Sequence, residues 1–174
     1  MQNEPFPSST IHQWKTMVWE AMSKNGNGVD YISESIIQKS SINKGYLHYG
    51  PRKYNTLFLI VCERLDPLTL TKVLEFVQEG GRVFCIDAYP HLSTGWHNHE
   101  ARDKEVQSLV EQLKKYSDRF ILLHKPEEDF IGWYQQVQKD YQITPYLTIE
   151  TPNPYLMQNR YITDEGNEMF FFAY

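Results

Sequence analysis

The sequence contains two cysteines and no long apolar segment. Cys62 and Cys85 do not have the spacing of a disulfide framework or a zinc site, so we expect buried free thiols. Two such thiols are compatible with an oxidising or a reducing compartment. No apolar run approaches the roughly 18 residues that a membrane-spanning helix requires. A charged start followed by an apolar stretch and a small-residue cleavage site is also missing, so the sequence gives no sign of a signal peptide.

Positive charge is scarce as well. Lys and Arg number 17 against 22 Asp and Glu, which gives a formal net charge of −5. A protein that binds nucleic acid needs a basic face to meet the phosphates, so we expect no nucleic-acid partner. For the same reason we expect no membrane partner. Aromatic residues, in contrast, reach 14%, and exposed aromatic side chains often serve sugar or protein contacts.

Glycine-rich nucleotide-binding motifs are absent. No G-x-G-x-x-G follows a predicted strand, and G-x-x-x-x-G-K-[ST] does not occur. Gly80-Gly81 stands before a predicted strand, where glycine ends a helix because it adopts the left-handed conformation without a clash. We therefore expect no dinucleotide or other cofactor.

What the chain does contain is a strand–helix–strand pattern between Tyr54 and Pro90. The apolar run 56–62 predicts a strand buried on both faces, and 82–87 predicts a second one. Asp66 as N-cap and Pro67 as first helical residue open the helix between them. Its predicted apolar stripe consists of Leu68, Leu70, Val73, Leu74 and Val77. Two such strands joined by a helix form a parallel βαβ unit.

Similar patterns flank this unit, and they predict an α/β fold with a doubly wound, mostly parallel sheet that is flavodoxin-like in broad terms. The expected helices are 10–24, 33–39, 101–115 and 127–139, the expected strands are 29–32 and 119–123, and 45–53 is expected to form a turn and a brief extended piece.

The tail changes character. Residues 146–149, 156–162 and 168–174 read as extended segments, and the turn at 164–167 predicts a hairpin between Asn159–Ile162 and Met169–Ala173. We predict a lead-in at 1–9, an α/β domain at 10–150, and β segments at 151–174 that lead to a further domain. The chain stops within the apolar run FFFAY, which would leave an open strand edge, so we expect a fragment of a longer protein.

One candidate for nucleophilic chemistry is Cys62, at the end of a predicted strand. Amidotransferase-like hydrolases place their thiol at such a point, on a tight turn flanked by glycine. Here the neighbours are Val61, Glu63 and Arg64, and no histidine–glutamate pair is spaced to activate the thiol. A structural thiol is the favoured interpretation.

The loop 88–100 with the preceding aspartate is the densest group of candidate ligands. A metal site needs three or four convergent ligands, so a solvated polar loop is favoured over a metal site. A packed loop aromatic is favoured over a sugar-stacking one for its tryptophan. The candidate ligand or interface residues are Asp87, His91, Trp96, His97, His99 and Glu100.

Paired carboxylates, the signature of glycoside hydrolysis, are the last candidate chemistry. Acidic residues lie near predicted strand ends and helix starts, where capping and the helix dipole explain them adequately. They are Glu63, Asp66, Asp87, Glu127, Glu128 and Asp129. No pair is placed well enough to be assigned as acid and base.

Three stretches together resemble a known family: WEAMSKNGNGVDYISESII (19–37), GYLHYGPRKYNTLFLIV (45–61) and LDPLTLTKVLEFVQEGGRVFCIDAYP (65–90). They look like the α/β domain of family-106 glycoside hydrolases, the α-L-rhamnosidase type. A similar domain, related to class I glutamine amidotransferases, serves as the trimerisation domain of some β-galactosidases. In the tail, 159–161 and 167–172 resemble the arginine, turn and Tyr-Phe strand that lead into a β-sandwich. The resemblance spans about residues 14–174.

This resemblance implies an accessory role. The family's catalytic carboxylates belong to a separate barrel domain, usually upstream, so no catalytic residue carries over to this chain. The implied partners are the barrel and β-sandwich of the same polypeptide, and carbohydrate through the loop 88–100. The parent family is often secreted or periplasmic. Two alternatives stay open: a free-standing amidotransferase-like hydrolase that uses Cys62, and a sugar- or metal-binding module.

Overall fold

The computed structural model describes residues 8–173, with side chains from Thr16 onward. The chain divides into two compact units, one formed by residues 31–125 and the other by the segment up to residue 30 together with the segment from residue 126. Within the described residues, no helix is long and apolar enough to cross a bilayer. The expected lead-in lies mostly outside the described residues, and helix α1 (Ser8–Lys24) already includes Ser8 and Ser9.

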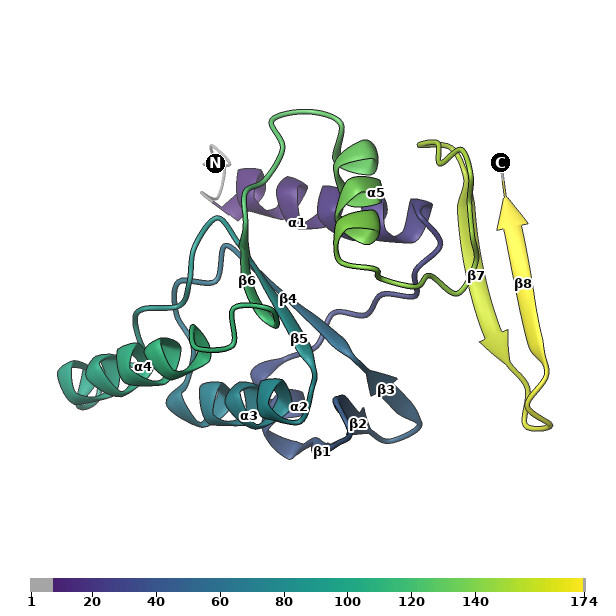
Figure 1. Cartoon of the computed structure of the whole chain (residues 1–174). Coiled ribbons are helices and arrows are strands. Elements are labelled where there is room, and N and C mark those ends of the chain that lie inside the picture. Colours follow the sequence, from purple (N-terminus) through teal and green to yellow (C-terminus); the bar gives the residue numbers. More distant parts are fainter. Residues whose placement is uncertain (1–7, 174) are drawn as a thin grey trace, which may run out of the picture. The chain divides into compact units, whose positions relative to one another are not determined.

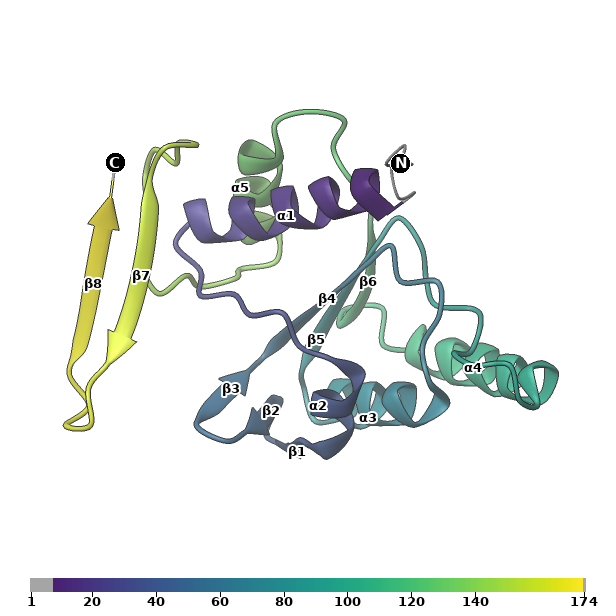
Figure 2. The same ribbon diagram turned by 180° about the vertical axis from the view of Figure 1, so that it is seen from behind.

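The 31–125 unit is built on a three-stranded parallel sheet in the order β4 (Thr56–Ile60), β5 (Arg82–Ile86), β6 (Phe120–Leu123). Leu57 pairs with Val83, and Val83 in turn pairs with Phe120. Helices α3 (Pro67–Gln78) and α4 (His99–Leu113) connect the strands and pack side by side along one face of the sheet (Figures 1 and 2). The predicted α/β class and the parallel βαβ unit are confirmed.

Helix α3 begins as the sequence predicts. Asp66 is the N-cap, and its Oδ1 accepts a hydrogen bond from the Leu68 N–H at 2.9 Å, with Pro67 at the first helical position. Its apolar stripe packs on the sheet-facing core, where Leu70, Val73 and Val77 are fully buried. The placement of Leu68 on that stripe was wrong: its side chain is 68% exposed, because it lies two residues, about 200° of helix rotation, from Leu70.

The start of this unit differs from prediction. Residues 29–32 form no strand, but α2 (Glu34–Lys39) forms with Ser33 as N-cap. An antiparallel meander of β1 (Ser41–Asn43), β2 (Tyr46–Tyr49) and β3 (Arg52–Tyr54) occupies the segment where a turn and a brief extended piece were expected. Its first turn needs glycine, because Gly45 has φ +74° and a Cβ there would stand 2.9 Å from the carbonyl carbon of Gly80.

The second unit contains α1 and α5 (Phe130–Asp140), which pack against each other. Helix α5 was expected to begin near Glu127. It begins three residues later because Asp129 is its N-cap, with Oδ1 accepting the Gly132 N–H at 2.9 Å. Tyr134 and Val137 are its buried residues. On α1, Val18, Ala21 and Met22 are buried and Met17 is exposed.

The predicted hairpin is confirmed as β7 (Met157–Ile162) and β8 (Glu168–Ala173), paired antiparallel. Residues 146–149 form no strand. Arg160 fixes the hairpin locally: its Nη2 is 2.6 Å from Glu168 Oε1, its Nε is 3.0 Å from Glu168 Oε2, and its guanidinium stacks 3.9 Å from the ring centre of Tyr146. The hydrogen bonds between Arg160 and Glu168 raise the pKa of the Arg160 guanidinium and lower the pKa of the Glu168 carboxyl.

Candidate functional site

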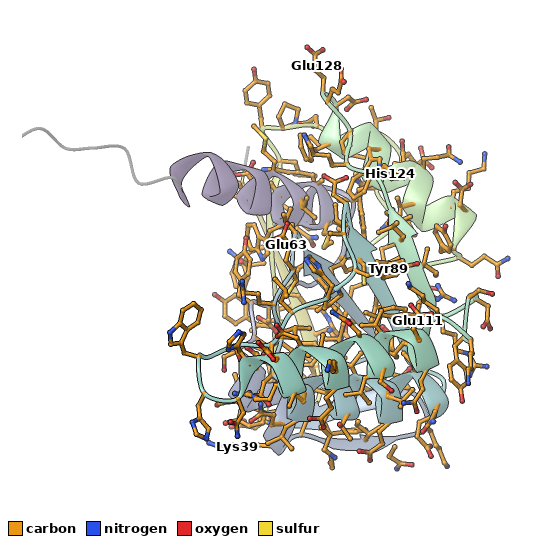
Figure 3. All side chains as sticks on the ribbon, turned by 90° about the vertical axis from the view of Figure 1, so that its left-hand side faces the viewer. Lys39, Glu63, Tyr89, Glu111, His124 and Glu128 are labelled. Carbon is orange, nitrogen blue, oxygen red and sulfur yellow. The ribbon has the colours of Figure 1, made fainter. Side chains whose placement is uncertain are left out.

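Three chain segments leave the carboxyl edge of the parallel sheet, where open α/β sheets usually bind ligands. They follow Ile60, Ile86 and Leu123, and Figure 3 labels one residue in each, namely Glu63, Tyr89 and His124. All the candidate residues of the sequence analysis within this unit lie on these segments or at the start of α4.

The first two segments leave the sheet through matched left-handed residues. Val61 has φ +47° and Asp87 has φ +65°. They stand at equivalent positions, since Ile60 pairs with Ile86, and each N–H reaches the next strand: Val61 N to Ile86 O at 3.2 Å, Asp87 N to Leu123 O at 2.8 Å. Left-handed backbone is a genuine outlier for a β-branched residue such as Val61. The sharp turn in the chain therefore falls one residue before Cys62.

Cys62 lies beyond β4, although the sequence analysis placed it within the strand. Its side chain is half-buried and packs against the core cluster, and its Sγ donates to the Arg64 carbonyl oxygen at 3.5 Å. The left-handed residue at this turn is Val61, which carries no reactive group. Cys85, in β5, is fully buried, and burial raises the pKa of its thiol to about 12.

Asp87 joins the ends of two strands. Its Oδ1 accepts the Lys125 N–H at 3.0 Å and lies 3.9 Å from Nδ1 of His124, whose side chain is exposed. An aspartate in the left-handed conformation that binds a backbone amide is a common turn device. The carboxylate of Asp87 is thus engaged in holding the β5 and β6 segments together.

The base of the loop after β5 is tied to the segment after β4. The Glu63 carbonyl oxygen accepts the N–H groups of His91 at 2.9 Å and Leu92 at 3.1 Å, and the Leu65 N–H donates to the Leu92 carbonyl at 3.1 Å. Gln107 of α4 donates its Nε2 to the His91 carbonyl at 3.2 Å. His91 thus contributes its backbone to the loop base, while its imidazole is exposed.

Ser93 is the buried anchor of the loop. Asp103 Oδ1 accepts both the N–H and the hydroxyl of Ser93, each at 2.7 Å. The Ser93 carbonyl accepts Nη1 of Arg64 at 3.2 Å. The two hydrogen bonds from Ser93 lower the pKa of the Asp103 carboxyl below its usual value. The sequence analysis missed this network, because no spacing between a loop serine and a helical aspartate marks such a contact.

A second carboxylate joins the starts of α3 and α4. Asp66 caps α3 and also pairs with Arg102, with 2.6 Å between Oδ2 and Nη2. Glu34 Oε2 accepts the Asp66 N–H at 2.8 Å and the Thr69 hydroxyl at 2.7 Å. The carboxylates of Glu34, Asp66 and Asp103 therefore serve structural contacts.

The tip of the loop is different, because it presents an aromatic pair to solvent. The Trp96 side chain is 87% exposed and stacks on the His99 ring, with 5.5 Å between centroids and 21° between planes. The loop is shorter than predicted, since α4 already begins at His99, which puts Glu100 in its first turn. Glu100 and His97 are exposed beside the pair.

Of the predicted candidates, the structure brings Trp96 and His99 into contact. Asp87 lies apart from them and binds the Lys125 amide, which joins the segments after β5 and β6. Across the described residues, no group of three His, Cys, Asp or Glu side chains is arranged to hold a metal ion. Comparisons with protein-family models, curated proteins and solved structures found no match.

Proposed function

We propose that this chain is a non-catalytic accessory α/β domain of a multidomain glycoside hydrolase of the α-L-rhamnosidase type. Its fold would be the flavodoxin-like, class I glutamine amidotransferase-like variant of the α/β class. The resemblance of residues 19–37, 45–61 and 65–90 to that family supports this proposal. The third stretch contains helix α3 and strand β5 of the parallel unit.

One observation carries the proposal: three of the carboxylates near the carboxyl edge of the sheet, those of Asp66, Asp87 and Asp103, are engaged in contacts that hold the local structure. Asp87 binds the Lys125 amide, Asp103 binds Ser93, and Asp66 caps α3 while it pairs with Arg102. A glycosidase needs two carboxyl groups free to face the scissile bond from opposite sides. Side chains that anchor a loop suit a domain that supports chemistry carried out elsewhere.

In this proposal, the domain braces a catalytic barrel and the loop 88–98 helps to shape the substrate cleft. The loop suits that role because its base is held at both ends by hydrogen bonds, while its tip is exposed. The other domains of the same polypeptide would be its partners.

The first test is turnover. The purified chain, assayed with p-nitrophenyl α-L-rhamnopyranoside and a panel of other aryl glycosides, is expected to release no p-nitrophenol above the buffer rate. Hydrolysis that persists after repurification, and is lost when Asp87 and Glu63 are replaced together by Asn and Gln, would overturn the accessory assignment.

The second test is the size of the native polypeptide. Antibodies raised against this chain are expected to detect, in extracts of the source organism, a polypeptide much larger than the 20.6 kDa of this chain. α-L-Rhamnosidase activity is expected to be depleted from the extract with that polypeptide. A native band at 20.6 kDa, or immunodepletion that leaves the activity in the extract, would contradict the proposal.

A further inference from the structure

The exposed indole of Trp96 lies at the tip of the loop, and the accessory role does not specify what it contacts. Tryptophan is among the most buried residues on average, yet 87% of this side chain is accessible to solvent. One face of the ring is backed by His99, at 5.5 Å and nearly parallel. The opposite face is therefore open, and its orientation is supported from behind.

The segment that carries this indole is held in place. Ser93, three residues before Trp96, is fully buried and makes two 2.7 Å hydrogen bonds to Asp103. Gly95, directly before it, has φ +84°, and a Cβ there would stand 3.3 Å from Nη1 of Arg102. His99, directly behind it, is the first residue of α4. A ring whose backbone is anchored on one side and whose face is backed by His99 loses less conformational entropy when a ligand stacks on it than a freely rotating ring does.

The surroundings of the ring indicate what kind of ligand would stack there. The polar residues that follow Trp96 are exposed: His97 and Asn98 in the loop and Glu100 in the first turn of α4 offer imidazole, amide and carboxylate groups. One indole supplies only about 150–250 Å² of buried surface. A stable protein interface needs about 1,000 Å² or more, with apolar neighbours around its central aromatic residue. A single flat aromatic ring surrounded by hydrogen-bonding groups instead matches one sugar ring.

We propose that Trp96, backed by His99, is the stacking platform of a carbohydrate subsite that accepts a neutral pyranose ring. The C–H face of the pyranose lies on the open face of the indole, and the exposed polar side chains of His97 and Glu100 are the candidates for binding ring hydroxyls. The proposal deepens the accessory role and rests on it for its natural ligand, a sugar unit of the parent enzyme's substrate. Binding of a pyranose as such does not depend on that role.

The test is an NMR titration of the ¹⁵N-labelled chain with methyl α-L-rhamnopyranoside, followed by methyl β-D-galactopyranoside. Saturable shifts are expected at the Trp96 indole N–H and at the backbone amides of Gly95 and His97, with dissociation constants on the order of millimolar. The acyclic polyol rhamnitol, which has the hydroxyls but no ring face, is expected to produce no saturable shift.

Variants assign the site. W96A is expected to bind at least about fivefold more weakly, followed at the Gly95 and His97 amides, whereas W96F retains part of the affinity because it keeps an aromatic face. Leu68→Ala is the matched control, because it removes another exposed apolar side chain from the same unit and is expected to bind like the wild type.

Three outcomes would overturn the subsite. The first is the absence of any saturable shift up to about 100 mM sugar. The second is equal binding of the sugar by W96A and the wild type. The third is a set of shifts that depend on protein concentration and not on sugar, which would show that another copy of the chain covers the ring. A native polypeptide of 20.6 kDa would overturn the accessory role alone. Preference for the rhamnoside over the galactoside would link the two proposals.

Discussion

Ser93 and Asp103 are joined by two hydrogen bonds to a single carboxylate oxygen, one from the serine N–H and one from its hydroxyl, both 2.7 Å long. Ser93 is fully buried in the loop after β5, and Asp103 lies one turn into α4. The pair therefore holds the loop on the helix that follows it. Because both bonds favour the charged carboxylate, they also couple the loop to pH.

The first prediction concerns acid. The pKa of Asp103 lies below its ordinary 3.8, so this carboxylate stabilises the fold above that value and loses its contribution as pH falls through the lower folded-state pKa. D103N keeps an acceptor oxygen but has no charge. We expect the Tm difference between wild type and D103N to be largest near neutral pH and to shrink as the pH falls below 3.8.

Thermal unfolding followed by circular dichroism across that pH range measures this difference. Glu105→Gln, an exposed carboxylate on the same helix with no resolved interaction at Ser93, is the matched control and is expected to show a smaller, flatter difference. A D103N curve parallel to that of the wild type at every pH would contradict the assigned role of the carboxylate.

The second prediction concerns Gly81 and Phe76. A Cβ on Gly81 would overlap the ring of Phe76, which is fully buried. We expect G81A to lower the free energy of unfolding by about 1–3 kcal/mol, as overpacking does elsewhere. Urea denaturation measures the loss.

A double-mutant cycle with F76L tests the cause. Replacing the flat ring by a smaller side chain makes space, so the double variant is expected to lose less than the sum of the two single losses. Gly50→Ala is the control for glycine replacement without a clash, since no atom of the described residues lies within 4 Å of its Cβ position and only the cost of its φ of +55° remains. Additive losses in the cycle would show that the ring is not the obstacle.

The third prediction concerns the two thiols. Cys85 is fully buried with its pKa raised to about 12, so only about 10⁻⁴ of it is thiolate at pH 8. We expect iodoacetamide to modify Cys85 only as fast as the protein unfolds, which peptide mass spectrometry with and without urea measures. Cys62 is expected to react no faster than a free cysteine. Selective, rapid alkylation of Cys62 in the folded protein would favour the amidotransferase-like alternative.

The fourth prediction concerns the hydroxyl of Tyr134 in the second unit. Tyr134 is buried, which raises its pKa, and its hydroxyl donates to Asn27 Oδ1 at 3.0 Å. That oxygen also accepts from Gln138 Nε2, so Y134F leaves no orphaned acceptor. We expect Y134F to lose about 0.5–1.5 kcal/mol. Exposed Tyr161 provides the control, because Y161F keeps the ring contact with Phe171 and is expected to be neutral.

The parallel unit was predictable from sequence because local and global signals agree there. The run 56–60 is apolar enough for a buried strand, Asp66-Pro67 gives an unambiguous helix start, and Gly80-Gly81 ends the helix. The hairpin was predictable for a similar reason, since the turn 164–167 separates two segments with strand character.

The meander at 41–54 was missed because its strands have three or four residues and carry polar side chains. Such short strands do not show a recognisable alternation of apolar and polar residues. The start of α5 was misplaced because Pro126 and three acidic residues offer several helix starts, and only the contact from Asp129 to Gly132 selects one. The left-handed turn at Val61 carried no sequence signal, since glycine or asparagine is the usual residue there.

The candidate site was predicted only in outline. The loop and its residues were recognised from their density of polar and aromatic groups, and the stacking of Trp96 on His99 follows from a turn that places the ring over the first helical residue. The loop's anchors were not recognisable. Ser93, Asp103 and Arg64 are common residue types, and only the fold brings them together.

The strands of the parallel sheet are adjacent in space in the same order as they occur along the chain, β4 beside β5 and β5 beside β6. Each strand therefore finds its neighbour already synthesised on the N-terminal side, and no gap has to be kept open for a later insertion. A nascent chain can zip this layer together from one end while the ribosome is still adding residues, which limits how long its apolar strands stay unpaired in the crowded cell.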